Sequence, residues 1–401
     1  MRKIVSLLFL LPMLLTACTS AFPDNPWENG TAVLSIRPQY PESFPTEEKS
    51  KGTLRLSSRR EDLTYECTAD KDGVFSITLP KGSYRAVYNL TYESYIFNGV
   101  LDRIILGSSD ADIELPLSVS KAGSLVIKEI YSGGCTKYPE EGNYASDSYI
   151  IVHNNSSQTE YLDSLCLGVI DPYRSIATNV WSDMDIDYVP VVQAIWQIGG
   201  TGRSFPLESG EDAVIVIYGA IDHASTYSQS VNLNKEDYFV CYSTAYFPNP
   251  NYHPAPGDKI QSERILSVVI KTGQANAYTF AQASPAPVIF RAPQGSTIQE
   301  FLQNGESIIQ KPGSSVDRIV KLPIDWVIDG VEVFEKAGKN KKRLPSGIDA
   351  GAVDFSGPYQ GHTLHRKTDE KSTSLCGYQV LQDTNNSTDD FYEREIQSLH
   401  E

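Results

Sequence analysis

Two stretches of sequence decide the fold: LVIKEIYSGGC at residues 125–135 and SYIIVHNNSSQTEYLDSLCLGV at residues 148–169. They contain three apolar runs, at residues 125–130, 149–152 and 161–169. The runs are separated by Gly133-Gly134 and by the polar cluster at residues 153–157. Glycine, asparagine and serine accept turn backbone that β-branched residues resist, so the pattern predicts antiparallel strands joined by turns.

The composition supports an all-β chain with more than one domain. The chain has 401 residues, which corresponds to two or three domains at a prior of about 150 residues each. Its 23 Tyr, 28 Gly and 23 Pro, with only 3 Met, suit sheets and turns better than a helical bundle. The formal net charge is −16. This acidity argues against nucleic acid as a partner, because phosphates select basic patches.

Residues 1–17 have the layout of a signal peptide. Arg2 and Lys3 precede an apolar core at residues 4–11, which is too short for a stable membrane span. Leu15-Thr16-Ala17-Cys18 resembles the bacterial lipobox, in which the cysteine is acylated and becomes the mature N-terminus. That resemblance, with Thr19 after Cys18, implies a lipid anchor in the outer membrane; the periplasmic face and the cell surface both remain open. Residues 18–30 are rich in Pro and Asn and are predicted to be a tether.

Residues 31–120 are predicted to form the first domain. Asp72-Gly73 marks a turn, residues 74–79 a strand, Pro80-Lys81-Gly82 a second turn and residues 84–88 a returning strand. This pattern resembles the transthyretin-like or carboxypeptidase-regulatory module. The resemblance implies a transthyretin-like or immunoglobulin-like β-sandwich, a hairpin at residues 74–88, and a role as a non-catalytic spacer.

Residues 121–391 resemble the lamin-tail domain, an immunoglobulin-like β-sandwich, and residues 392–401 are left as a tail. The resemblance is clearest in the opening stretches and at residues 195–200, 205–223 and 322–382. The two modules together resemble an uncharacterised family of bacterial lipoproteins of unknown function. This resemblance implies an all-β fold of two β-sandwich domains, the second with long insertions. It implies no particular activity, because the family has none assigned.

One insertion, CYSTAYFPNPNYHPAPG at residues 241–257, is the candidate binding loop. Its ring-bearing residues are Tyr242, Tyr246, Phe247, Tyr252 and His253, and four prolines lie among them. Rings on a stiff loop offer the rigid contact area that sugars and protein partners use. The alternative is that the loop packs its own rings on the sandwich.

Two acidic clusters are candidate metal sites. Asp183, Asp185 and Asp187 alternate, so on a strand their carboxylates would share one face, and calcium takes clustered carboxylates. The spacing does not match an EF-hand, and we favour a solvated loop without a cofactor. In the second cluster, DTNNSTDD at residues 383–390, we favour side chains that fix turn backbone over a metal.

Catalytic and covalent signatures are sparse. The sequence has no GxSxG elbow, P-loop or HExxH motif, and Gly199-Gly200-Thr201-Gly202 lacks the Lys-Ser/Thr pair of a phosphate loop. A pair of glycosidase acids leaves no sequence signature, so a hydrolase of glycans or phosphoesters stays an alternative. For the five cysteines after Cys18 we favour buried free thiols over a Cys135–Cys166 bridge.

Two local patterns give sharper predictions. Thr297 with Glu300 makes a capping box, which predicts a short helix that ends at Asn304-Gly305. KAGKNKKR at residues 336–343 is predicted to be a basic hairpin tip. Taken together, the sequence predicts an outer-membrane lipoprotein that binds an outer-membrane transporter or a glycan without catalysis. A purely structural envelope component is the other alternative.

Lipidation at Cys18 is directly testable. Cys18→Ser should release the protein from the membrane fraction, because acyl chains supply an anchor to which each buried methylene contributes about 0.8 kcal/mol. Fractionation of cells that express the variant would measure this. A variant that still pellets with membranes after a salt wash places the anchor elsewhere.

Overall fold

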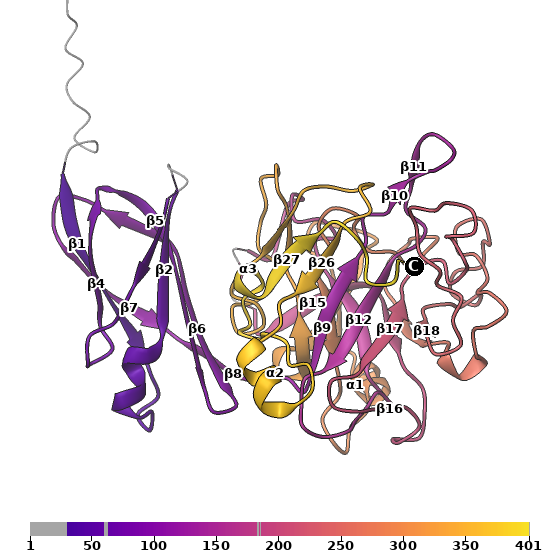
Figure 1. Cartoon of the computed structure of the whole chain (residues 1–401), viewed down its shortest axis with the longest axis horizontal. Coiled ribbons are helices and arrows are strands. Elements are labelled where there is room, and N and C mark those ends of the chain that lie inside the picture. The colour runs from indigo at the N-terminus through magenta and orange to yellow at the C-terminus, as the bar shows by residue number, and fades with distance from the viewer. Residues whose placement is uncertain (1–29, 60–62, 183, 185, 401) are drawn as a thin grey trace, which may run out of the picture.

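The computed structural model describes residues 30–59, 63–182, 184 and 186–400. Figure 1 shows two β-rich domains lying side by side, an N-terminal domain of strands β1–β8 and a larger C-terminal domain of strands β9–β27. The prediction of an all-β chain with β-sandwich domains is confirmed.

The N-terminal domain is a sandwich of a three-stranded and a five-stranded sheet. The first sheet has the order β4 (Phe75–Pro80), β1 (Thr31–Gln39) and β7 (Ala111–Pro116). The second has the order β3 (Thr64–Cys67), β2 (Thr53–Ser58), β5 (Gly82–Tyr92), β6 (Tyr95–Leu106) and β8 (Ser118–Lys121). A 3₁₀ turn, η1 (Thr46–Lys51), precedes β2. Strand β1 alternates exposed and buried residues, so that Leu34 and Ile36 enter a core shared with Leu54, Phe75 and Tyr88.

The hairpin expected at residues 74–88 is wrong. Strand β4 pairs with β1, whereas β5 pairs with β2 and β6 in the other sheet. The turn at Lys81 therefore carries the chain across the sandwich from one sheet to the other. Both strands are half-buried, and alternation alone does not distinguish a hairpin from a crossover between sheets.

The C-terminal domain packs a six-stranded sheet against a seven-stranded sheet. The six-stranded sheet has the order β18 (Phe239–Val240), β17 (Asp212–Val216), β12 (Tyr149–Asn154), β9 (Leu125–Tyr131), β26 (Thr363–Arg366) and β27 (Phe391–Arg394). The seven-stranded sheet has the order β21 (Ile308–Gln310), β22 (Arg318–Pro323), β15 (Tyr188–Gln197), β14 (Cys166–Ile170), β20 (Pro287–Phe290) and β23 (Val327–Gly330), with β19 (Ser267–Lys271) also paired to β15.

Smaller elements connect and cover these sheets. Three two-stranded pairs are β10 (Cys135–Thr136) with β11 (Asn143–Tyr144), β13 (Glu160–Tyr161) with β16 (Pro206–Leu207), and β24 (Val333–Glu335) with β25 (Val353–Phe355). The helical elements are η2 (Ser262–Arg264), α1 (Ile298–Gln303), η3 (Ile324–Trp326), α2 (Glu370–Cys376) and α3 (Ser387–Asp390). Helix α1 has the predicted capping box of Thr297 and Glu300 and ends at Asn304.

The central strands of both sheets are buried on both faces, which explains why their sequences are continuous apolar runs. In β12 every residue is buried: Ile150 and Val152 face the core between the sheets, while Tyr149 and Ile151 face a second cluster under the loops after β17. Likewise, Leu167 of β14 faces the central core and Cys166 the outer cluster of the seven-stranded sheet. Coverage of a sheet on both sides removes the usual alternation of apolar and polar residues.

The third apolar run, expected as one strand over residues 161–169, is divided by a tight turn. Strand β13 ends at Tyr161, Leu165 donates its N–H to the Leu162 carbonyl at 3.0 Å, and β14 begins at Cys166. The five cysteines that the structure describes are all free; four are buried, as expected, and Cys376 is exposed.

The two domains meet through polar contacts. The Asn89 and Asn98 amides each donate to the Thr384 carbonyl at 3.1 Å, and Asn98 also donates to the Asn385 carbonyl at 3.2 Å. Arg55 of β2 pairs with Asp389. The five-stranded sheet of the N-terminal domain therefore contacts the C-terminal domain mainly through residues 384–389.

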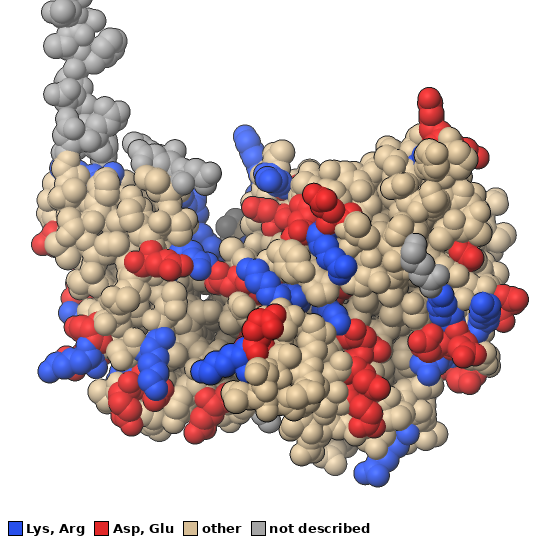
Figure 2. All heavy atoms as spheres, in the orientation of Figure 1, with Lys and Arg blue, Asp and Glu red and all other residues tan. Residues whose placement is uncertain are grey.

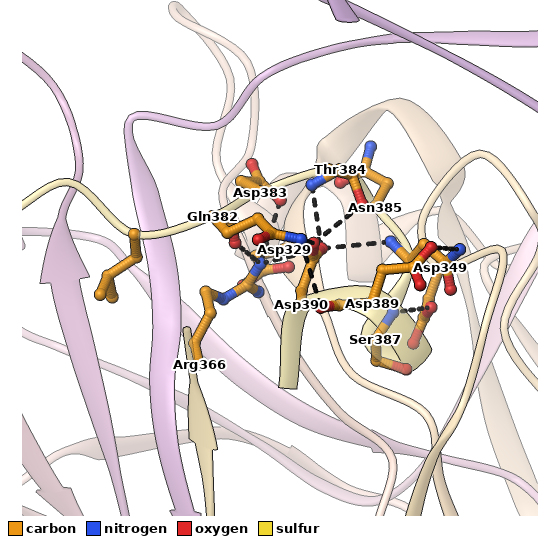
Figure 3. A network of polar contacts seen from close by, with 12 residues as sticks. Asp329, Asp349, Arg366, Gln382, Asp383, Thr384, Asn385, Ser387, Asp389 and Asp390 are labelled. Atoms are coloured by element: carbon orange, nitrogen blue, oxygen red, sulfur yellow. Dashed lines mark hydrogen bonds and ion pairs between the residues drawn. The ribbon is translucent and has the colours of Figure 1, made fainter. Parts of the chain in front are cut away.

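That segment is held by a buried guanidinium, which Figure 3 shows from close by. Arg366, at the end of β26, is only 2% exposed. It donates to Asp329 at 2.6 Å and to Asp383 at 3.1 Å, and lies 3.6 Å from Asp390. Asp390 in turn accepts hydrogen bonds from the Thr384 N–H at 2.9 Å and the Thr384 hydroxyl at 2.8 Å. The backbone that faces the N-terminal domain is thus fixed from inside the C-terminal domain.

Burial makes these carboxylates hard to ionise. It raises the pKa of Asp329 and of Asp390 to about 7, while the Arg366 charge acts in the opposite direction and the Asp383 charge adds to the rise. One arginine thus faces three acids in a buried site, and two of the acids hold their protons close to neutral pH.

Removal of this charge should be costly. We expect Arg366→Met to lower the free energy of unfolding by about 3–5 kcal/mol, the range for breaking a buried ion pair, because the acids lose their only buried cation among the described residues. Urea denaturation measures the loss. Arg318→Met, at an exposed position of β22, is the matched control and should stay within about 0.5 kcal/mol of the parent. Equal losses in both variants would contradict the argument.

The raised pKa values also predict how stability depends on pH. A carboxyl whose pKa is higher in the folded than in the unfolded chain holds an extra proton when folded, so stability falls as pH rises toward that pKa. Between pH 6.5 and 8 the melting temperature should therefore fall as Asp329 and Asp390 ionise. The lowered pKa values of His223 and His253 have the opposite effect, which is half complete at pH 6.5, the pKa of an unfolded histidine, and fades through the lower part of that window. Asp390→Asn should make the decline shallower; an unchanged decline would refute the assignment.

Candidate functional site

The candidate loop at residues 241–257 lies at the end of the C-terminal domain that points away from the N-terminal domain (Figure 1). The structure divides its five ring-bearing residues into two groups. Phe247 and His253 are buried, at 1% and 3% exposure, and Tyr242 packs partly buried against the cluster under the loops. Tyr246 and Tyr252 are 41% and 53% exposed. The expected surface of five rings is therefore reduced to two tyrosines.

The buried rings anchor the loop to the sandwich. Phe247 stacks on Trp196 of β15 with ring centroids 5.9 Å apart and planes at 15°. His253 stacks on Tyr242 at 4.9 Å and 17°. The ammonium of Lys271 lies 4.4 Å from the Phe247 ring centroid and donates to the Tyr246 carbonyl at 3.0 Å. These contacts explain why Phe247 and His253 are not available at the surface, since the loop needs their burial to hold its shape.

The protonation state of His253 fits this anchoring role. Burial, together with the positive charge of Lys271, lowers the pKa of His253 to about 4. The ring is therefore neutral at physiological pH, and its Nε2 accepts the Ser243 N–H at 3.1 Å. The loop keeps this hydrogen bond over the whole physiological pH range.

A second candidate site is a cleft of about 510 Å³ at the junction of the two domains. The N-terminal domain lines it with residues of η1, β2 and β5, and the C-terminal domain with Lys367 and parts of the segment at residues 382–389. Three cations, Lys51, Arg55 and Lys367, face one carboxylate, that of Asp389. Figure 2 shows basic and acidic side chains next to one another along this junction.

Strand β26 and the residue after it supply a buried and a half-buried cation at this place. Successive strand residues point to opposite sides, so Arg366 enters the acid cluster while Lys367, just after the strand, reaches the cleft. The Lys367 ammonium donates to the Asp389 carbonyl. This cleft is a site that the sequence analysis missed, because its two walls lie about three hundred residues apart along the chain and no local pattern pairs them. The only local signals are the adjacent Arg366 and Lys367 and the polar run at residues 383–390.

The acidic candidates differ in outcome. Asp183 and Asp185 lie outside the described residues, and Asp187 is exposed in the turn before β15, so a shared strand face is not observed. Among the residues that the structure describes, no group of three or more His, Cys, Asp or Glu is placed to hold a metal ion. In the cluster at residues 383–390, the Asp390 carboxylate accepts backbone N–H groups of its own segment, as expected for a structural role.

The glycine-rich loop at residues 199–202 is occupied by the protein's own carboxylate. Asp163 accepts the N–H groups of Gly202 at 2.8 Å, Ser204 at 2.9 Å and Phe205 at 3.0 Å. These hydrogen bonds lower the pKa of Asp163 against the opposing effect of its burial. The backbone donors that a phosphate would need are therefore already satisfied.

The predicted lipidation site, Cys18, and the signal peptide lie outside the described residues. In the part of the chain that is described, no helix has both the length and the apolar character needed to span a bilayer.

Comparisons with known proteins place the chain near one family. The family described as a protein of unknown function (DUF4876) matches residues 208–398. A crystal structure of a DUF4876 family protein from Bacteroides thetaiotaomicron is similar at 25% sequence identity and a TM-score of 0.59, covering 91% of this chain and 95% of that one. No curated protein matches the chain.

Two DUF3823 family proteins show only weak likeness. The one from Parabacteroides merdae has 10% identity and a TM-score of 0.18, covering 47% of this chain and 82% of that one. The one from Bacteroides ovatus has 11% identity and a TM-score of 0.17, with 47% and 81% covered. The chain is thus similar to the DUF4876 family of unknown function, in sequence over residues 208–398 and in structure over nearly its whole length.

Proposed function

We propose that this protein is a lipid-anchored component of the outer membrane that binds a glycan or an outer-membrane transporter and does not catalyse a reaction. The observation that carries the proposal is the pair of exposed rings, Tyr246 and Tyr252, on a loop whose other rings are anchored in the core. An anchored loop loses little conformational entropy on binding, so its exposed rings contribute more of their contact energy to affinity.

The arrangement of the domains supports the same role. An acyl anchor at Cys18 would hold the chain at the N-terminal domain, which begins with β1. The tyrosine-bearing loop lies at the opposite end of the molecule (Figure 1). The N-terminal domain then acts as a spacer that carries the loop away from the membrane surface.

The state of the buried acids favours binding over hydrolysis. Burial raises the pKa of Asp147 to about 6, in the range where a catalytic acid operates. However, its carboxylate accepts hydrogen bonds from the Tyr131 hydroxyl at 3.0 Å and from the Ser230 hydroxyl. Asp329 and Asp390, with similar pKa values, are bound to Arg366 and to backbone N–H groups. These acids serve the fold rather than an open cleft with a free acid pair.

The test removes both exposed rings. Tyr246→Ala with Tyr252→Ala should weaken binding at least about tenfold, since each truncated contact tyrosine commonly costs more than about 1 kcal/mol. The melting temperature should barely change, because neither ring is buried. Binding is measured on an array of soluble polysaccharides and by capture of detergent-solubilised outer-membrane proteins.

Tyr95→Ala is the matched control, because Tyr95 is 46% exposed but lies on β6 of the other domain. It should leave binding unchanged. A double variant that melts several degrees lower yet binds normally would show that the two rings serve the fold. Turnover of any bound polysaccharide would favour the hydrolase alternative.

A further inference from the structure

We propose that the cleft between the two domains is a second binding site and that it takes a short oligosaccharide carrying carboxylate groups, such as a uronic-acid trisaccharide. The site is independent of the tyrosine loop, which lies at the far end of the C-terminal domain (Figure 1). The inference goes beyond the proposed function, because it concerns different residues and names a ligand class.

The shape of the cleft suits a small ligand. Its volume of about 510 Å³ lies within the range of about 300–1,000 Å³ that is typical of ligand sites, and such sites favour domain interfaces. One wall consists of the end of η1 with β2 and β5, and the other of Lys367 after β26 with the segment at residues 382–389. A ligand in the cleft would therefore contact both domains at once.

The charge of the lining indicates an anion. Lys51 and Arg55 come from the N-terminal domain and Lys367 from the C-terminal domain. The single lining carboxylate, Asp389, is already satisfied, because it pairs with Arg55 and accepts the Asn386 amide at 2.7 Å. A ligand carboxylate between the walls would thus meet cations from both sides.

The exposed partner of Arg55 can be exchanged. Arg55 pairs at 3.0 Å with Glu66, whose side chain is 65% exposed, whereas Lys51 pairs at 2.6 Å with Glu48, whose side chain is 19% exposed. Surface pairs of this kind contribute about 0–1 kcal/mol, so a ligand carboxylate can replace an exposed glutamate at little cost. Lys367 donates to the Asp389 backbone carbonyl, and no ion pair joins it to a carboxylate of a described residue.

The remaining lining and the whole-molecule charge narrow the class of ligand. Thr53 and Thr91 present exposed hydroxyl groups on β2 and β5, which can both donate to and accept from sugar hydroxyls. The net charge of −16 opposes a long polyanion such as nucleic acid, whose charge extends far beyond the cleft. A short sugar with separated carboxylates fits both the local cations and the acidic surroundings.

The test titrates the full mature protein with three probes, the trisaccharides of galacturonate, glucuronate and guluronate, by calorimetry at low salt. At least one should bind with one-to-one stoichiometry, and binding should weaken as sodium chloride is raised, because salt screens exposed charges. Lys51→Gln and Lys367→Gln should each weaken it at least about tenfold, as expected for the loss of a hydrogen bond between charged groups. Lys259 is an exposed lysine that does not line the cleft, so Lys259→Gln is the control and should bind like the parent.

Several outcomes would overturn the proposal. If none of the three probes binds, or if Lys51→Gln and Lys367→Gln bind as tightly as the Lys259→Gln control, the cleft is not the site. If the neutral trisaccharide cellotriose binds as tightly as the acidic probes, the carboxylates are not recognised. If inorganic phosphate displaces the probe at equal concentration, the cleft is a bare anion site and the sugar is not recognised. The Tyr246→Ala, Tyr252→Ala variant should bind the probes normally, so failure here is distinguishable from failure of the proposed function.

Discussion

A single buried guanidinium, that of Arg366, balances three buried acids whose carboxylates would otherwise repel one another. Replacement of such a network by apolar residues is often neutral for stability, whereas removal of one partner is costly. We therefore regard the network as a device that selects one conformation of residues 382–390. That conformation matters because the Thr384 and Asn385 carbonyls meet Asn98 of the other domain. One side chain in the C-terminal domain thus holds the segment that carries several of the contacts to the N-terminal domain.

The C-terminal domain can carry such a polar junction because its stability comes from apolar clusters between and outside its two sheets. Leu125, Ile150 and Trp196 pack between the sheets, and further clusters cover both outer faces. The apolar area buried by strands covered on both sides is the dominant favourable term in folding. The two candidate binding regions lie at the ends of the domain, outside these apolar clusters. One end bears the anchored tyrosine loop, and the other faces the N-terminal domain.

The sequence was sufficient where the deciding interactions are local. Thr297 and Glu300 are three residues apart, so their capping box could be read directly, and residues 383–390 were correctly expected to fix turn backbone. It failed where a partner is distant. Phe247 is buried because Trp196 lies beneath it. The predicted basic tip at residues 336–343 ends in Arg343, which is buried against Glu332 at 2.7 Å. The cleft had no signal, because Lys51 and Lys367 become neighbours only through tertiary structure.

The polar character of the junction has a thermodynamic consequence. Interfaces between domains that rely on hydrogen bonds rather than apolar area allow relative motion by default. The contacts across this junction include several of that kind, such as Arg55 with Asp389 and Asn98 with Asn385. A ligand that bridges Lys51 and Lys367 adds interactions present only when the walls are apposed, so it must stabilise that arrangement by its differential affinity. By the same linkage, a change that loosens the Arg366 network must weaken the binding of the ligand. The buried charge and the cleft are therefore coupled through one conformational equilibrium.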